Sequence, residues 1–152
     1  MGLLADYPHL VADVGHLRWR EWGRPPEPTD LEYWVSVTGD EAGRISLPVS
    51  WVALDADGQA VGAVGLGEFD IEERRDQSPW VMGMVVRPDQ RRRGIGRLLL
   101  ATLTDWASGR GVQQVWVATA GAAVSFYNDC GWETVETFSR GWEKTTVLVR
   151  QL

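Results

Sequence analysis

The sequence predicts a single α/β (α+β) domain whose mixed, mostly antiparallel sheet is flanked by helices. Two pairs of segments, the apolar residues 49–54 and 60–66 and the later residues 133–138 and 145–150, each surround a turn that contains glycine, which is typical of antiparallel hairpins. Between these pairs, an apolar run, a stretch with helical spacing and a second apolar run form a strand–helix–strand unit. Such a unit joins parallel strands by a right-handed crossover.

The first third of the chain predicts two helices. Residues 7–22 place Leu10, Val14 and Leu17 on one stripe, and the Gly-Arg-Pro-Pro sequence at 23–26 ends that helix. Thr29 and Glu32 have the spacing of a capping box before a second, shorter apolar pattern that runs to residue 37. We expect Gly39 to end this second helix.

The next two segments, residues 49–54 and 60–66, are expected to form a hairpin around the turn at 56–59. Both are apolar on successive residues, so the sheet should be covered on both faces. The loop at 67–79 that follows is rich in carboxylates. It is either a solvated charged loop or an entrance that attracts a cationic amine through its negative potential.

Residues 82–100 contain the most informative pattern in the chain, an apolar run followed by a glycine loop and a stretch with helical spacing. The apolar run stops at Arg87-Pro88, because proline lacks the donor that a strand ladder needs. A glycine loop then leads into a helix whose expected buried positions are Ile95, Leu99, Leu103 and Trp106. The predicted order is strand, glycine loop and helix.

This order predicts an anion site. The first amides of a helix lack partners within the helix, and the helix dipole adds positive potential there. Gly94 and Gly96 keep side chains away from such an anion, and the three arginines at 91–93 add positive charge. A dinucleotide fingerprint is excluded because Leu99 stands at its third glycine, and a P-loop is excluded because Arg97-Leu98 follows Gly96.

The last third of the chain completes the sheet. Residues 113–118 read as a buried strand after a helix stop at Gly109 and Gly111, and residues 122–129 read as a helix ended by Gly131. Residues 133–138 and 145–150 are expected to pair around Gly141.

Two segments resemble the GNAT superfamily of N-acetyltransferases. Arg91-x-x-Gly94-x-Gly96 resembles its Gln/Arg-x-x-Gly-x-Gly/Ala loop, and residues 123–132 (Ala-Val-Ser-Phe-Tyr-Asn-Asp-Cys-Gly-Trp) resemble its later Ala-x-x-Phe-Tyr-x-x-x-Gly-Phe/Trp segment. The resemblance implies the acyl-CoA N-acyltransferase fold, with acetyl-coenzyme A (acetyl-CoA) as co-substrate and its pyrophosphate on the loop amides. The implied contacts with the coenzyme are Met84, Val85, Val86, Arg91, Arg92, Arg93, Gly94, Ile95, Gly96, Arg97 and Tyr127.

The sequence departs from the family pattern at two places. Ala120 stands where many members have an asparagine that contacts the coenzyme, which puts that accessory contact in doubt. The family also opens with a strand, for which residues 1–6 have little room, so that strand is expected to be short or missing.

The resemblance assigns chemistry to a few residues. Tyr127 would protonate the departing thiolate or donate a hydrogen bond to the sulfur of the coenzyme; the alternative is a tyrosine whose ring only packs. Glu68 and Asp70 are the carboxylates from which a general base is expected, because the central strand at 80–86 offers none. A backbone amide near Val85 or Val86 would polarise the acetyl carbonyl, beside a bulge that Gly83 permits.

The composition bears on three other kinds of function: nucleic-acid binding, metal binding and cysteine chemistry. A formal charge of −6 argues against broad nucleic-acid binding, although the arginines at 91–93 could also be read as a basic patch. His9 and His16 lack thiolate or carboxylate partners in the pattern, so we expect no metal. The single cysteine, Cys130, suits a reducing compartment, and its thiol is expected to be buried and inert rather than an acyl-carrying nucleophile.

The sequence therefore predicts an N-acetyltransferase that moves acetyl from acetyl-CoA to a primary amine by direct attack in a ternary complex. A small cationic molecule is the expected acceptor, given the acidic loop and the nine tryptophans. The alternatives are acetylation of protein N-termini or lysines, and a non-catalytic sensor of coenzyme A. We expect a cytoplasmic protein without membrane segments, and a homodimer is one assembly compatible with the sequence.

Overall fold

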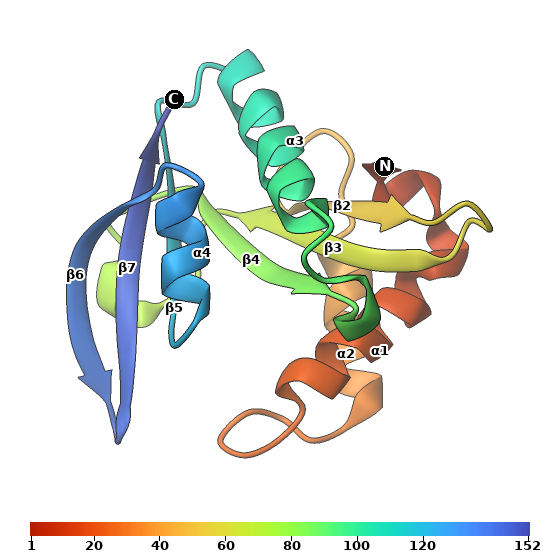
Figure 1. Ribbon diagram of the computed structural model, residues 1–152, viewed down its shortest axis with the longest axis horizontal. Helices are drawn as coiled ribbons and strands as arrows, with labels where there is room; N and C mark the ends of the chain where they lie inside the picture. The colour runs from red at the N-terminus through yellow and green to blue at the C-terminus, as the bar shows by residue number, and fades with distance from the viewer. The chain divides into compact units, whose positions relative to one another are not determined.

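The computed structural model describes residues 1–152 and shows a sheet of seven strands in the order β1-β2-β3-β4-β5-β7-β6 (Figure 1). The strands are β1 Gly2–Leu3, β2 Val49–Leu54, β3 Ala60–Gly67, β4 Trp80–Val86, β5 Gln114–Thr119, β6 Glu133–Arg140 and β7 Glu143–Gln151. The helices are α1 Val11–Trp22, α2 Leu31–Asp40, α3 Ile95–Gly109 and α4 Ala123–Asp129. Short 3-10 turns are η1 Leu4–Asp6, η2 Pro8–Leu10, η3 Glu72–Arg74 and η4 Pro88–Gln90.

The strand directions confirm the predicted fold class. Strands β1 with β2, β2 with β3, β5 with β7 and β6 with β7 pair antiparallel, whereas β4 pairs with β5 in parallel at Trp80 and Trp116. The first strand, expected to be short or missing, is present with two residues, Gly2 opposite Val52 and Leu3 opposite Trp51.

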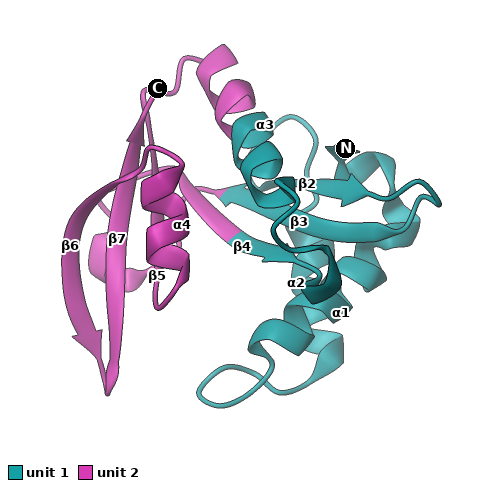
Figure 2. Ribbon diagram, in the orientation of Figure 1, with its two compact units in different colours: residues 1–66, 83–103 teal, residues 67–82, 104–152 magenta.

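The chain divides into two compact units (Figure 2). Unit 1 contains residues 1–66 and 83–103, and unit 2 contains residues 67–82 and 104–152. The boundary passes within β4, after Met82, and within α3, after Leu103, so each of these two elements contributes to both units.

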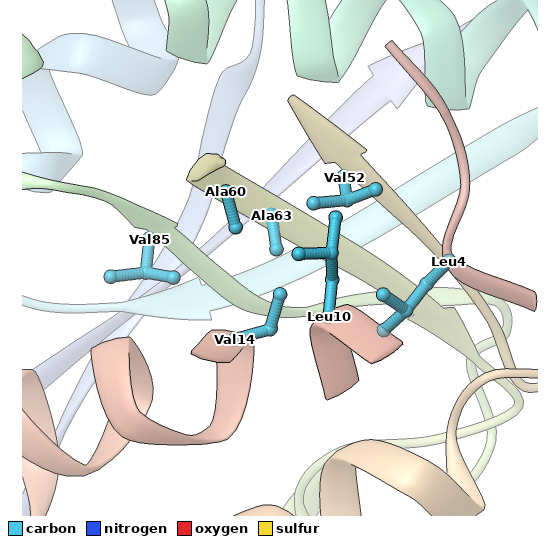
Figure 3. Close-up of a cluster of buried hydrophobic side chains, with 7 residues drawn as sticks. All are labelled: Leu4, Leu10, Val14, Val52, Ala60, Ala63 and Val85. Atoms are coloured by element: carbon cyan, nitrogen blue, oxygen red, sulfur yellow. The ribbon is translucent and has the colours of Figure 1, made fainter. Parts of the chain in front are cut away.

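Unit 1 has a core between α1 and the strands. Leu10 and Val14 pack with Val52 of β2, Ala63 of β3 and Val85 of β4 (Figure 3). All are at most 4% exposed, and burying a side chain such as leucine or valine is worth about 1.5–3 kcal/mol. Toward α3, Ile95 and Leu99 approach Gly62 of β3 closely. These strands are thus covered on both faces, as their continuous apolar sequence predicts.

The helices of unit 1 differ from the prediction at their ends. Residues 8–10 form η2, and α1 begins only at Val11. The N-cap of α2 is Asp30 rather than Thr29, because a carboxylate oxygen of Asp30 accepts a hydrogen bond from the Glu32 amide at 3.1 Å. The same helix continues past Gly39 to Asp40. The expected buried stripe of α3 holds at Leu99 and Leu103, which are 0% exposed, whereas Ile95 and Trp106 are half-buried.

The hairpin between β2 and β3 turns where the sequence predicts it. The Asp55 carboxylate accepts hydrogen bonds from the amides of Asp57 and Gln59, each at 2.9 Å. Gly58 takes the positive φ of 79° that the turn requires.

Unit 2 has its own core and a tethered loop. Ile71 and Trp80 pack with Trp116 of β5 and with Val147 and Val149 of β7. Residues 133–151 form the terminal hairpin, as predicted, with β6 longer than expected. Two ion pairs, Arg74 with Glu136 and Arg140 with Glu73, tie the loop after β3 to β6. None of the helices has the length and apolar content needed to cross a membrane.

Candidate active site

The loop between β4 and α3 has an unusual backbone. After η4, Arg92 takes a φ of 65° and Gly94 a φ of 81°; Arg92 is the one residue other than glycine with a positive φ. A β-carbon on Gly94 would meet no atom within 4 Å, so the space beside this residue is open. Alternating backbone conformations of this kind turn successive amides toward one side and form an anion-binding concavity.

The start of α3 adds to this concavity. The Gly94 carbonyl accepts the first helical bond from the Leu98 amide at 3.0 Å. The helix begins at Ile95, so the amides of Ile95 and Gly96 have no acceptor within the helix. The positive end of the helix dipole lies at the same point. The backbone present therefore fits the diphosphate group that the sequence predicts.

The arginines of this loop differ in what they can do. Arg91 donates from Nε to the Val86 carbonyl at 3.0 Å and from Nη2 to Glu21 Oε2 at 2.9 Å. Its side chain therefore fixes the loop to the end of β4 and to α1. Arg92 and Arg93 are exposed, as is Arg97 in the first turn of α3, so these three can place positive charge near a bound anion.

Strand β4 contains the residues at which the sequence predicts the acyl site. Gly83 has a φ of 57°, which interrupts the extended strand and agrees with the irregularity predicted there. Val85 is 4% exposed and belongs to the core of unit 1, so only its backbone is available to a substrate. Met84 and Val86 are half-buried.

The structure adds a residue that sequence reasoning missed. Arg18 of α1 is 2% exposed, and its Nε donates to the Gly83 carbonyl at 3.1 Å. One signal was available, because Arg18 follows Val14 by four residues and therefore shares its buried face.

Tyr127 lies in unit 2, on α4, and is 3% exposed. Its ring packs edge-on against Phe126 and Trp132, with centroid distances of 5.4 and 5.3 Å. Burial raises the pKa of Tyr127 well above its usual value, and electrostatic interactions with Cys130 and Asp70 raise it further. The phenol therefore stays protonated throughout the neutral range and is a hydrogen-bond donor.

The two expected carboxylates, Glu68 and Asp70, follow β3 in unit 2, and both are exposed. Asp70 lies close enough to Tyr127 for its charge to raise the pKa of the phenol. No comparable link joins Glu68 to Tyr127. The structure thus brings together Tyr127 and Asp70 within unit 2, and the loop and β4 residues within unit 1. A joint action of the two groups on one substrate stays a prediction.

The remaining reactive side chains do not form a further centre. Cys130 is half-buried rather than buried, in no disulfide, and its amide caps α4 by donating to the carbonyls of Phe126 and Tyr127. His9 contacts Tyr7 and His16 contacts Trp19 through their rings. No three histidine, cysteine, aspartate or glutamate side chains lie together in a way that could hold a metal ion.

A family model described as "Acetyltransferase (GNAT) family" matches residues 11–132, which include both the arginine-glycine loop and the Phe126-Tyr127 segment. The chain belongs to this family. The resemblance drawn from the two sequence segments is confirmed, and with it the expectation of a GNAT acetyltransferase. No curated protein matches the sequence.

Solved structures show the same fold. A GCN5-related N-acetyltransferase from Kribbella flavida is 22% identical, with a TM-score of 0.69 over 97% of this chain and 93% of that one. An aminoglycoside 6'-N-acetyltransferase complexed with coenzyme A is 15% identical, with a TM-score of 0.74 over 95% and 91%. A GNAT family acetyltransferase from Elizabethkingia anophelis with acetyl-CoA bound is 14% identical, with a TM-score of 0.55 over 69% and 76%.

Proposed function

We propose that this GNAT acetyltransferase moves the acetyl group of acetyl-CoA to the primary amine of a small cationic molecule, by direct attack within a ternary complex. The main support is the loop before α3, where two residues with positive φ precede a helix start, a backbone of the kind that suits a diphosphate. Two structures that share the fold contain coenzyme A or acetyl-CoA.

The chain would hold the co-substrate mainly through its backbone. Amides of residues 92–96 bind the diphosphate, and the exposed Arg92, Arg93 and Arg97 add charge. Arg91 acts through its bonds to Val86 and Glu21, which fix the loop. A main-chain amide of β4 at Val85 or Val86 polarises the acetyl carbonyl, because it is in place before the reaction and needs no reorganisation.

Acetyl transfer forms one C–N bond and breaks one C–S bond. The amine must lose a proton, since a free alkylamine with a pKa near 10 is protonated at neutral pH. Asp70 is the preferred acceptor of that proton, directly or through water, because its charge lies close enough to Tyr127 to raise the pKa of the phenol. Glu68 is the second choice.

Tyr127 acts on the departing sulfur. Its raised pKa lies above that of an ordinary thiol, about 8.5, so complete proton transfer to the thiolate is unfavourable. The hydrogen bond from the phenol therefore supplies the stabilisation as negative charge develops on sulfur, and the thiolate takes up a proton after it departs.

The proposal of a cationic acceptor is based on the negative charge of the loop after β3. The loop after β3 is rich in carboxylates, although Glu72 and Glu73 are held by Arg75 and Arg140. Glu68 and Asp70 are exposed in this loop and would favour an approaching cation. One structure that shares the fold is an aminoglycoside acetyltransferase.

We further propose that both units form one acetyltransferase domain over residues 1–152. Because β4 and α3 each run from one unit into the other, neither unit contains a complete set of elements. The family model also extends across the boundary.

The test is release of free thiol from acetyl-CoA in the presence of single amines. The panel contains aminoglycosides, polyamines, small neutral amines, and peptides with a free N-terminus or a lysine. The proposal predicts release that requires a cationic small amine. Release with peptides alone would instead assign protein acetylation. Thermal stabilisation by acetyl-CoA without release for any amine would indicate a sensor and contradict the proposal.

A further inference from the structure

The further inference concerns Arg18, a buried cation that none of the steps above uses. Nε donates to the Gly83 carbonyl at 3.1 Å, and Nη1 donates to Thr38 Oγ1 at 3.1 Å. Nη1 also lies 3.6 Å from Glu41 Oε1, whereas Nη2 has no hydrogen-bond partner although it is buried. The guanidinium thus connects α1, the end of α2 and β4, all within unit 1.

Stability does not explain this arrangement. Moving a guanidinium out of water is costly, and an apolar side chain of similar size often replaces a buried ion pair without loss. An unpaired buried donor adds to the cost. The contact with Glu41 is long, 3.6 Å between Nη1 and Oε1, and burial raises the pKa of that carboxyl although the nearby guanidinium lowers it. We therefore infer that the Arg18 side chain fixes the position of a neighbouring group rather than adding stability.

The position that it fixes is Gly83. A β-carbon on Gly83 would lie 2.7–2.8 Å from Nε, the guanidinium carbon and Nη2 of Arg18, so the missing side chain makes room for the arginine. Gly83 also has the positive φ, 57°, that an L-residue rarely adopts. The two residues are therefore matched: Gly83 gives β4 its irregular backbone, and Arg18 holds the carbonyl of that same residue.

The direction of the amides that follow Gly83 in β4 depends on the backbone conformation of Gly83. In a strand, successive N–H groups alternate in direction, and a residue with positive φ resets that alternation. Gly83 precedes Val85 and Val86 in β4, and one of their two amides is assigned above to the acetyl carbonyl. We propose that Arg18 is a positioning residue for acetyl transfer, which holds the Gly83 carbonyl so that the amide of Val85 or Val86 points at the acetyl oxygen. This inference rests on the proposed function.

The variants are R18M, R18K and T38V. Methionine keeps the length and apolar stem of Arg18 but cannot bond Gly83, so R18M should remain folded and should bind coenzyme A through residues 91–97 as the wild type does. Its kcat should fall at least tenfold with KM for acetyl-CoA changed less than threefold. R18K, which can donate to Gly83 from one point only, should recover part of kcat. T38V removes a contact to α2 and keeps the Gly83 contact, so it should lower the unfolding temperature and leave kcat within twofold.

The carbonyl itself gives a readout that a purely structural role would not move. Acetyl-CoA labelled with ¹³C at the carbonyl should show a lower C=O stretching frequency on the wild-type protein than in solution, and R18M should return the frequency toward the free value. A wild-type frequency or a wild-type kcat in R18M overturns the inference. Equal loss of kcat in R18M and T38V, in proportion to their unfolding temperatures, overturns it as well.

The two proposals fail in different ways. Because the labelled carbonyl is observed without an amine, a wild-type protein that binds acetyl-CoA and shifts its frequency but acetylates no amine contradicts the proposed function alone. A wild-type protein that transfers acetyl and shifts the carbonyl frequency, while R18M does both equally well, contradicts the role of Arg18 alone.

Discussion

Tyr127 combines deep burial with a polar group, and its environment decides what chemistry it can perform. Phe126 and Trp132 surround the ring, and the nearby Asp70 charge disfavours a phenolate. A phenol that does not ionise near neutral pH donates a hydrogen bond under all assay conditions. Its contribution should then be visible in turnover and not in the shape of the pH profile.

Tyr127→Phe is expected to lower kcat by about 100-fold, the lower end for removing one preorganised hydrogen-bond donor to a developing negative charge. The dissociation constant for coenzyme A should change less than threefold, because the proposed diphosphate contacts are made by the backbone amides of residues 92–96. Steady-state kinetics and calorimetry measure the two quantities. Tyr33→Phe is the matched control, since Tyr33 is 44% exposed. Unaltered kcat in Tyr127→Phe would remove Tyr127 from the mechanism.

The raised pKa of Tyr127 also predicts the pH dependence of stability. Above the ordinary phenol pKa of about 10, the unfolded chain loses this proton while the folded chain keeps it. The stability from the buried neutral phenol is therefore complete below about pH 10 and is lost as pH rises toward the folded-state pKa. Urea unfolding from pH 8 to 11 should show a steeper decline for wild type than for Tyr127→Phe. Parallel declines would contradict the assigned pKa direction.

Asp70 and Glu68 can be separated by a pair of variants. Asp70→Asn should lower kcat/KM at pH 7 by about tenfold or more, and Glu68→Gln should have the smaller effect. The loss in Asp70→Asn should shrink toward pH 10, where the amine deprotonates without help. A larger loss in Glu68→Gln would reverse the assignment, and full activity in both variants would leave water as the only proton acceptor.

Single residues show where sequence reasoning reached its limit. Gly94 was predicted from the motif, and its positive φ is confirmed. The positive φ of Arg92 was not predicted, because arginine carries no preference for that conformation. Arg18 was missed since a lone arginine on a helix is usually solvated, and only the tertiary structure shows that Gly83 lies beneath its guanidinium.

In the proposed function, coenzyme binding depends on the loop before α3, and two glycines allow a matched test of this proposal. Gly94 and Gly58 have φ values of 81° and 79°, and a β-carbon at either would meet no atom within 4 Å. Alanine at either position should therefore lower the free energy of unfolding by a similar amount, about 1 kcal/mol.

Of these two variants, only Gly94→Ala should weaken the binding of coenzyme A. Its added methyl group and strained backbone disturb the amide concavity, so the dissociation constant for coenzyme A should rise about tenfold or more, whereas Gly58→Ala should bind as the wild type does. Isothermal calorimetry gives the constants and chemical unfolding gives the stabilities. Equal affinities in the two variants would place the diphosphate away from this loop.

The N-terminus of α2 tests the corrected cap. Asp30→Ala should lower the free energy of unfolding by about 1 kcal/mol, because the Glu32 amide loses its partner, whereas Thr29→Ala should change it little. Chemical denaturation measures both. The opposite order would restore the capping box expected from sequence. Thr29 and Asp30 are both good caps, so spacing alone could not choose between them.

Elements with strong periodicity or turn chemistry were predictable. The hairpin of β2 and β3, the start of α3 and the terminal hairpin follow from apolar runs, glycine turns and proline stops. The N-terminal ends of α1 and α2 were less predictable, because the 3-10 turn at Pro8–Leu10 and the cap at Asp30 depend on local geometry. The two-residue β1 owes its existence to pairing with β2, which no local pattern in the sequence reveals.

At the scale of the whole molecule, the residues named in the proposed function are divided between the two units. The coenzyme loop, β4 from Gly83 onward and Arg18 belong to unit 1, and Tyr127, Asp70 and Glu68 belong to unit 2. The family assignment was accessible from the sequence because two motifs far apart in the chain fit one family pattern, in the same order. The acceptor was not accessible, since its recognition depends on the three-dimensional arrangement of loops.

A crystal structure with coenzyme A bound tests the proposed site at this scale. We expect diphosphate oxygens within hydrogen-bond distance of backbone amides in residues 92–97, and the sulfur within reach of the Tyr127 hydroxyl. Coenzyme bound with its diphosphate elsewhere, or no coenzyme at saturating concentration, would contradict the proposed site and the mechanism built on it.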